Sequence, residues 1–313
     1  MKKYAYGVDL GGTTVKIGRF STDGELVHKY EIPTRKEDSG AFILKDIADS
    51  IMKDLTEAGL EKDDLHGIGI DVPGPVHEEA VVNRCVNLGW GVRPVAEEMR
   101  KLTGIENVKV ANDANAAALG EMWKGGGEGY TDVVMITLGT GVGGGIVLNG
   151  KIVGGTFGAA GEVGHMQVNA EETRVCGCGG TGHLEQYCSA TGIAYLGTEA
   201  LKNTDRPSVL REKKNLTAKH VFDAAKQGDE VAVEVAEHVG QVLGRAMASI
   251  SCVIDPQIYV IGGGVSRAGS YLLNLVSENF KKTAFHASVD TKIVLAKLGN
   301  DAGMYGAVKL VLD

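Results

Sequence analysis

The stretch Gly161–Tyr187, GEVGHMQVNAEETRVCGCGGTGHLEQY, gathers residue types that could bind a metal ion and a polar ligand. In chain order these residues are Glu162, His165, Cys176, Cys178, His183 and Glu185. A core strand or helix has no need of this combination, because its inward side chains are mostly apolar. The stretch is typical of a loop that a metal ion shapes and that presents polar groups to a small ligand, although a polar surface loop is the simpler alternative.

Two histidines and two cysteines of this stretch form a set suited to tetrahedral zinc: His165, Cys176, Cys178 and His183. The Cys-x-Cys spacing is tighter than the common Cys-x-x-Cys, so the motif supports a metal site only moderately. Four protein ligands would leave no open position for water, so zinc bound here would be structural.

Two hairpins rich in glycine and threonine could hold phosphate groups. The first, Gly11–Thr14, follows Asp9, and the second is Gly139–Gly141. Glycine lets backbone N–H groups approach an anion, and threonine adds a hydroxyl donor. The Asp9 carboxylate could hold Mg²⁺ directly or through water. Each hairpin taken alone could equally be a tight β-turn.

Two further segments lie between a predicted strand and a predicted helix. The run Gly262–Gly264 could pass under a flat nucleotide ring, or it could be a loose loop before a helix. Asn112 and Asp113 could simply cap the helix that follows them. A capping carboxylate can also face a cleft, where Asp113 could take a proton from an attacking hydroxyl group.

Strands and helices alternate along the chain, which predicts an α/β fold. The hairpin DLGGTTVKIGRFSTDGELV from Asp9 is similar to TLGTGVGGGIVLNGKIV from Thr137, and NDANAAALGE from Asn112 is echoed by NDAGMYGA from Asn300. Two features repeated in the same order indicate a duplication, with two lobes facing each other across a cleft. The glycine-rich segment 125–129 is the predicted linker, and residues 184–200 are predicted to be a single helix.

Composition excludes several functional classes. The net charge is −8, and no basic patch or tail stands out, which argues against a nucleic-acid partner or an anionic membrane surface. No apolar run approaches the ~18 residues of a membrane span. Five cysteines, an odd number, argue against a disulfide framework and favour a reducing compartment, so we expect a cytoplasmic protein.

With these motifs in order, the sequence closely resembles sugar kinases of the ROK family (repressor, open reading frame, kinase), within the actin-like ATPase superfamily. The motifs that carry the resemblance are DLGGT at Asp9, NDANAAALGE at Asn112, LGTGVGGGI at Leu138, GEVGH at Gly161 and CGCGGTGHLEQ at Cys176. VPGPV at Val72 and VNLGW at Val86 are most similar to the glucokinase branch. The resemblance implies a two-lobed, ribonuclease H-like fold with duplicated βββαβα-type halves. The predicted small lobe is residues 1–112 plus 300–313, and the large lobe is residues 113–299.

The resemblance also implies ATP-dependent phosphorylation of the 6-hydroxyl of glucose, with Asp113 as the general base. The residues expected to bind the sugar are Gly74, Asn112, Asp113, Glu162, His165 and Glu185. Those expected to bind ATP and its Mg²⁺ are Asp9, Gly11, Gly12, Thr13, Thr14, Lys16, Gly139, Thr140, Gly141, Gly262, Gly263 and Gly264. Structural Zn²⁺ is expected on His165, Cys176, Cys178 and His183, with His165 also touching the sugar.

One departure from the family affects the metal site. The family pattern is C-x-C-G-x-x-G-C-x-E, and its third cysteine is His183 in this sequence. Imidazole is also a good zinc ligand, so we expect a Cys₂His₂ site. Cys188 is the less favoured substitute, because it falls on a predicted helix where it could simply pack.

Several alternatives remain open at this point. The sugar could be N-acetylmannosamine, N-acetylglucosamine, fructose or allose, and the phosphoryl donor could be polyphosphate. A sugar-responsive repressor of the same family would carry an N-terminal helix-turn-helix, for which the first strand, a few residues after Met1, leaves no room. A sugar-binding module without catalysis is disfavoured by the presence of Asp9 and Asp113. Family members are commonly dimers or tetramers, so we expect a homo-oligomer.

Overall fold

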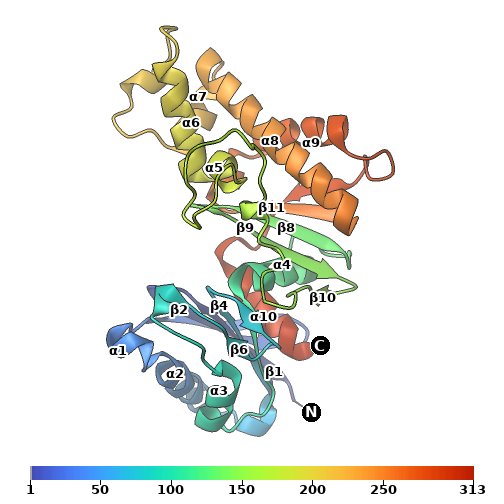
Figure 1. The fold of residues 1–313 in the computed structure, drawn as a ribbon. Helices are drawn as coiled ribbons and strands as arrows, with labels where there is room; N and C mark the ends of the chain where they lie inside the picture. The colour runs from blue at the N-terminus through green and yellow to red at the C-terminus, as the bar shows by residue number, and fades with distance from the viewer. Residues whose placement is uncertain (1) are drawn as a thin grey trace. The chain divides into compact units, whose positions relative to one another are not determined.

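A computed structural model describes residues 2–313, which form two compact units (Figure 1). The first unit comprises residues up to Val133, Gly145–Gly161 and Lys297–Asp313; the second comprises Val134–Gly144 and Glu162–Ala296. Helix α4, Asp113–Lys124, and the glycine-rich segment 125–129 both belong to the first unit. The lobe limits after residues 112 and 299 stay a prediction.

The first unit is built on a five-stranded sheet with the order β3-β2-β1-β4-β7. Its strands are β1 (Tyr4–Leu10), β2 (Thr14–Ser21), β3 (Leu26–Pro33), β4 (Leu65–Val72) and β7 (Val108–Asn112). Strands β1, β2 and β3 form an antiparallel meander, while β1, β4 and β7 run parallel. The carboxyl ends of the three parallel strands therefore meet at one end of the sheet.

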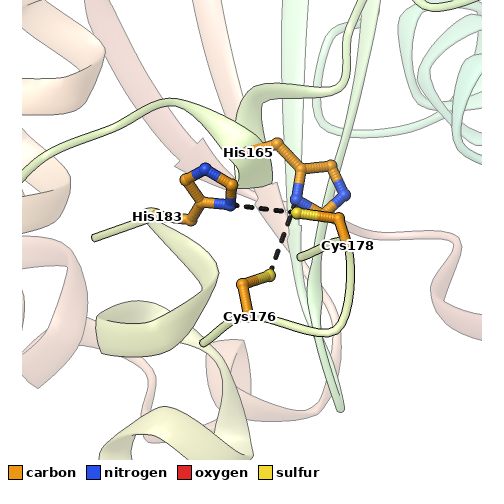
Figure 2. A group of neighbouring side chains, drawn as sticks. All are labelled: His165, Cys176, Cys178 and His183. Carbon is orange, nitrogen blue, oxygen red and sulfur yellow. Dashed lines mark hydrogen bonds between the residues drawn. The ribbon is translucent and has the colours of Figure 1, made fainter. Parts of the chain in front are cut away.

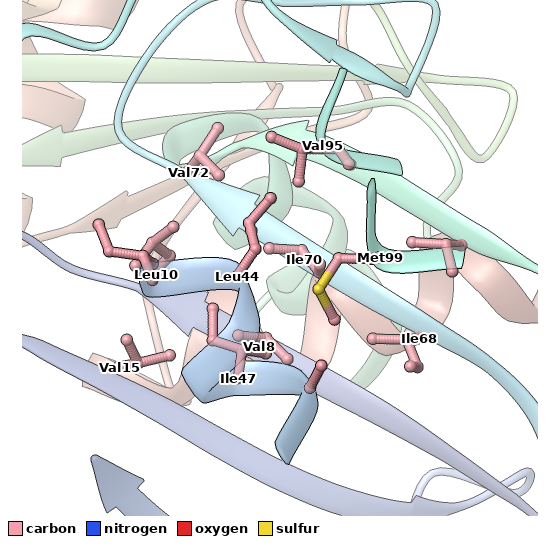
Figure 3. Close-up of a cluster of buried hydrophobic side chains, with 14 of the residues drawn as sticks. Val8, Leu10, Val15, Leu44, Ile47, Ile68, Ile70, Val72, Val95 and Met99 are labelled. Carbon is pink, nitrogen blue, oxygen red and sulfur yellow. The ribbon is translucent and has the colours of Figure 1, made fainter. Parts of the chain in front are cut away.

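Side chains alternate between the two faces of the sheet along each strand. Both faces carry apolar residues, and helices cover both. On one face, α2 (Ile43–Glu57) and α3 (Val95–Thr103) pack on a large buried cluster, part of which Figure 3 shows. Val8 and Ile70 belong to this face. On the other face, α10 (Ala302–Leu312) packs against Ala5 and Phe20.

Glycines let α10 approach its neighbours closely. A Cβ atom placed on Gly69 of β4 would lie 1.7 Å from the carbonyl oxygen of Ala307, and one on Gly7 of β1 would lie 2.3 Å from that of Met304. Gly306 faces α4 in the same way, since its Cβ would lie 1.7 Å from the carbonyl oxygen of Ala116. Helix α10 is therefore held against both the sheet and α4 at distances that only glycine allows.

Gly306→Ala is expected to lower the free energy of unfolding by about 3 kcal/mol, because α4 and α10 must move apart to admit the methyl group. Urea denaturation of the purified protein would measure the loss. Gly91→Ala is the control, since a Cβ atom at Gly91 would meet nothing within 4 Å. Equal denaturation midpoints for the two variants would contradict the close packing of α4 and α10.

The second sheet repeats the topology of the first. Its order is β10-β9-β8-β11-β12, so in each sheet the third, second, first, fourth and fifth strands lie side by side. The strands are β8 (Val133–Leu138), β9 (Val142–Leu148), β10 (Lys151–Ile152), β11 (Ile258–Gly262) and β12 (Lys292–Leu295). The shared order confirms the duplication predicted from the repeated motifs, and with it the α/β, actin-like fold class.

The helices of the second unit are α5 (Glu185–Cys188), α6 (Ala190–Lys202), α7 (Ala218–Lys226), α8 (Glu230–Ile254) and α9 (Ser270–Thr283). The single helix predicted over residues 184–200 is wrong. The backbone of Ser189 is extended, and its side chain accepts a hydrogen bond from Gly192 N–H as the N-cap of α6. Serine favours such a cap, which ends α5 and starts a new helix.

Three further short elements lie in the first unit: α1 (Glu37–Gly40), β5 (Val76–His77) and β6 (Val81–Val82). Across residues 2–313, no helix combines the length and the apolar character needed to cross a membrane.

Candidate active site and metal centre

The carboxyl ends of β1, β4 and β7 bring several predicted site residues into one row. Asp9 lies near the end of β1, Gly74 follows the end of β4, and Asn112 ends β7. Asp113 begins α4 directly after Asn112. Ligands of open α/β sheets bind outside the carboxyl ends of parallel strands, so this row is suitably placed for a substrate.

Asn112 and Asp113 lie at the junction between β7 and α4, where Asn112 caps the helix and also contacts the Asp113 carboxylate. The Asn112 side chain is the N-cap of α4, because its Oδ1 accepts hydrogen bonds from the N–H groups of Ala114 and Asn115. Its Nδ2 donates to the Gly74 carbonyl at 3.3 Å and to Asp113 Oδ1 at 3.0 Å. The cap therefore fixes the neighbouring carboxylate and ties it to the Gly74 loop.

The first predicted phosphate hairpin is a tight turn between β1 and β2. Gly11 N–H donates to the Thr14 carbonyl at 3.1 Å, while the Thr34 hydroxyl donates to the Gly11 carbonyl at 2.7 Å. Lys16 places its Nζ 2.7 Å from Asp9 Oδ2. Burial lowers the pKa of Lys16, but the hydrogen bond and charge of Asp9 outweigh this effect, and the pKa is raised overall.

The second predicted hairpin and the glycine loop 262–264 are neighbours in the second unit. Gly263 has a positive φ of 81°, and a Cβ atom there would lie 2.5 Å from the carbonyl oxygen of Leu138, where β8 ends. Gly139 N–H closes the hairpin by donating to the Gly141 carbonyl at 2.9 Å. The loop predicted to lie beside the nucleotide is thus adjacent to a predicted phosphate turn.

A cavity of about 330 Å³ opens beside this loop. Gly264 and Val265 form part of its wall, and Phe222 and Asp223 of α7 form another part. Its volume suits a bound ring system. Sequence reasoning missed the α7 wall, because that helix has an ordinary amphipathic pattern and no motif.

Glu185, the first residue of α5, connects the second hairpin with the cysteine loop. Its Oε2 accepts a hydrogen bond from Val142 N–H at 3.2 Å, and its Oε1 accepts one from the Cys176 thiol at 3.4 Å. A Cβ atom at Gly141 would lie 2.1 Å from Glu185 Oε2. Glycine at position 141 therefore leaves the room that this carboxylate occupies.

The predicted zinc ligands come together, as Figure 2 shows. The ligand atoms of His165, Cys176, Cys178 and His183 all lie within 4.8 Å of one another. His183 Nδ1 lies 3.3 Å from Cys178 Sγ, and His165 Nδ1 lies 3.9 Å from Cys176 Sγ. Tetrahedral zinc with ordinary bond lengths requires about 3.6 Å between sulfur and nitrogen ligands, so the set fits zinc.

The two ring nitrogens of His165 lie near different groups. Its Nδ1 points into the cysteine–histidine group, whereas its Nε2 lies 3.9 Å from Glu162 Oε2. Both side chains are partly exposed to solvent. One imidazole can therefore bind a metal through Nδ1 and still present Nε2, beside Glu162, to a ligand. Cys188 lies apart from this group, with a fully buried thiol whose pKa burial raises.

Sequence reasoning missed one carboxylate, Asp71 of β4. It is completely buried, and in the parallel register it is the partner of Asp9. Burial raises the pKa of Asp71 well above its ordinary range, and the nearby Asp9 and Asp113 carboxylates add to this shift. A lone aspartate at the end of a strand carries no motif, so only the pairing of β1 with β4 could reveal it.

Comparisons with known proteins identify the family of this chain. The ROK family model matches residues 5–313. The chain is 45% identical to a glucokinase of Halalkalibacterium halodurans over 99% of this chain and 95% of the relative. Among solved structures, a ROK family glucokinase from Streptomyces griseus in complex with glucose and AMPPNP is 31% identical, with a TM-score of 0.74 and 98% of both chains covered. A ROK family transcriptional regulator, described as a homolog of the E. coli MLC protein, is 27% identical with a TM-score of 0.85, covering 100% of this chain and 79% of its own. This chain belongs to the ROK family.

Proposed function

We propose that this protein transfers the γ-phosphoryl group of ATP to the 6-hydroxyl of glucose. The observation that carries the proposal is the row at the carboxyl ends of β1, β4 and β7, which has Asp113 and a phosphate-type hairpin at the same end of one sheet. The 45% identity to a glucokinase selects glucose among the hexoses. The ROK glucokinase structure with glucose and AMPPNP supports ATP as the donor.

Asp113 is the general base in this mechanism. It accepts the proton of the 6-hydroxyl as the oxygen attacks the γ-phosphorus, and the bond from that phosphorus to the β–γ bridging oxygen breaks to release ADP. Asn112 keeps Asp113 in place through the cap of α4. Glu162, His165 and Glu185 hold sugar hydroxyls, and the backbone of Gly74 lines the pocket.

The hairpins supply donors for the phosphates. Backbone N–H groups of Gly11–Thr14 and Gly139–Gly141, with the hydroxyls of Thr13 and Thr140, face the negative charge that spreads over the phosphoryl oxygens. Asp9 would hold Mg²⁺ directly or through water, and bound Mg²⁺ neutralises phosphate charge. The adenosine occupies the cavity beside Gly264.

Zinc has a structural role in this proposal. With four protein ligands it has no open position, so it takes no part in phosphoryl transfer. Zinc held by His165, Cys176, Cys178 and His183 would fix the loop that carries Glu162 and His165, and it would also fix Cys176, whose thiol donates a hydrogen bond to Glu185. The sugar-binding side chains thereby remain in a single arrangement.

A substrate panel tests the proposal. ADP release would be measured with glucose, mannose, fructose, allose, N-acetylglucosamine and N-acetylmannosamine, and transfer from polyphosphate would be measured as sugar phosphate. We expect kcat/KM with ATP to be at least about tenfold higher for glucose than for any other sugar. A higher value for an N-acetylhexosamine would reassign the substrate. Sugar binding without turnover on any donor would indicate a repressor or a binding module instead.

A further inference from the structure

The imidazole ring of His183 lies against Gly180, within the loop that carries the cysteine–histidine group. A Cβ atom placed on Gly180 would lie 2.5 Å from Cε1 of His183 and 2.7 Å from its Nε2, the two nearest atoms outside the chain neighbours of Gly180. The other ring nitrogen, Nδ1, lies 3.3 Å from Cys178 Sγ (Figure 2). One rigid ring therefore carries the nitrogen that faces the metal group and the atoms that occupy the space beside Gly180.

Hydrogen bonds hold the backbone on both sides of this contact. The Gly180 carbonyl accepts from Cys176 N–H at 2.7 Å. The buried Gln186 side chain accepts from His183 N–H at 3.0 Å, and Gln186 N–H donates to the His183 carbonyl at 2.9 Å. A methyl group at position 180 would therefore be accommodated by movement of the imidazole ring, since side-chain torsions are the softest part of this contact.

The size of that movement decides whether His183 can still be a metal ligand. Carbon atoms in contact lie about 3.5–4.0 Å apart, so Cε1 would have to retreat by about 1 Å. Distances from zinc to its ligands vary by only about 0.2 Å. A ring displaced by several times that tolerance would no longer reach the metal with proper geometry, although the loop itself would keep its fold.

We propose that Gly180 is a positioning residue of the metal centre, because the space beside its Cα lets the His183 imidazole join the other three ligands of the cysteine–histidine group. A cysteine at position 183 would not need this space, since its sulfur is bonded directly to Cβ and the side chain has no ring. Gly180 and His183 therefore act as a pair. The inference rests on the structural zinc of the proposed function and is independent of phosphoryl transfer.

Zinc affinity, measured without sugar or ATP, tests this pair. The metal would be removed by chelation, and zinc would be returned in competition with a chromophoric chelator. Gly180→Ala should bind zinc about 10- to 100-fold more weakly than the wild type, as for other residues that orient a metal ligand. In a His183→Cys background, Gly180→Ala should change the zinc affinity by less than about twofold, because no ring remains to be displaced.

Gly177→Ala is the matched control, since it adds the same methyl group to the same loop. Neither Gly177 nor Gly180 has a positive φ, so alanine brings no left-handed strain at either position. Apart from its chain neighbours, a Cβ atom at Gly177 would meet no atom of residues 2–313 within 4 Å. The zinc affinity of this variant should stay within about twofold of the wild type.

Thermal melting of the metal-free proteins separates positioning from a purely structural role. Without zinc, the half-buried imidazole can turn away from Gly180, so metal-free Gly180→Ala should melt no lower than the metal-free wild type. A lower melting temperature, an unchanged zinc affinity, or an equal loss of affinity in the His183→Cys background would each overturn the inference. A wild type that binds no zinc would overturn the metal site and this inference together. A wild type that binds zinc but phosphorylates no glucose would refute the proposed phosphoryl transfer alone.

Discussion

Asp113→Asn is expected to lower kcat for glucose phosphorylation by about 10³-fold and to leave glucose binding intact. Asparagine has the same shape as aspartate but cannot accept the hydroxyl proton. The helix start survives the change, because Asn112 is the N-cap of α4 and asparagine at position 113 keeps a side-chain oxygen that can accept from Ala114 N–H, as Asp113 Oδ1 does at 2.8 Å. Steady-state ADP release would give kcat, and calorimetry would give the glucose dissociation constant.

The matched control for this variant is Asp49→Asn, an exposed aspartate of α2 that pairs with Lys45. It makes the same chemical change in the same unit and should keep wild-type kinetics. If Asp113→Asn turned over at a rate near that of the wild type while still binding glucose, Asp113 would not be the general base.

Loss of the metal is expected to weaken glucose binding by at least about tenfold. The chain should be purified with about one zinc ion, and either strong chelation or Cys178→Ser should remove it. His165 would then lose its partner at Nδ1, and the loop that carries Glu162 would lose its anchor. Elemental analysis would measure zinc, and calorimetry would measure the affinity for glucose.

Two further variants sharpen the metal test. Cys252→Ser changes an exposed cysteine outside the cysteine–histidine group and should affect neither zinc content nor glucose binding. His183→Cys restores the cysteine of the family pattern and should retain zinc. Full zinc content in Cys178→Ser, or unchanged glucose affinity after zinc is removed, would refute the structural role of this site.

Much of the fold and the candidate site could be predicted where the chemistry is local. Three features can be recognised from a few neighbouring residues: the glycine hairpins, the Cys-x-Cys loop and the Asn112–Asp113 junction. Within each unit, the structure brings the expected groups of these features together. The helix break at Ser189 escaped prediction because the apolar spacing continues across it. Serine can either cap or continue a helix, and only its extended backbone decides between the two.

The features that sequence reasoning missed depend on which strands and helices are neighbours. Asp71 can be recognised as a site residue only from the pairing of β4 with β1, which places it opposite Asp9. Phe222 can be recognised as a wall of the cavity only because α7 lies beside the glycine loop at Gly264. Periodicity indicates that a segment is a strand or a helix, but it carries no information on its partners.

The position of α10 also governs the order in which the chain can fold during synthesis. This helix follows the whole second unit in sequence, yet it covers one face of the first sheet and packs on α4. The ribosome therefore releases β1, β4 and β7 long before the helix that shields Ala5, Phe20 and Asp71. Because domains fold as units while they emerge, the second unit can reach its final structure first. Until α10 emerges, one face of the first sheet stays uncovered. In the nascent protein, the segment that emerges earlier is the one that matures later.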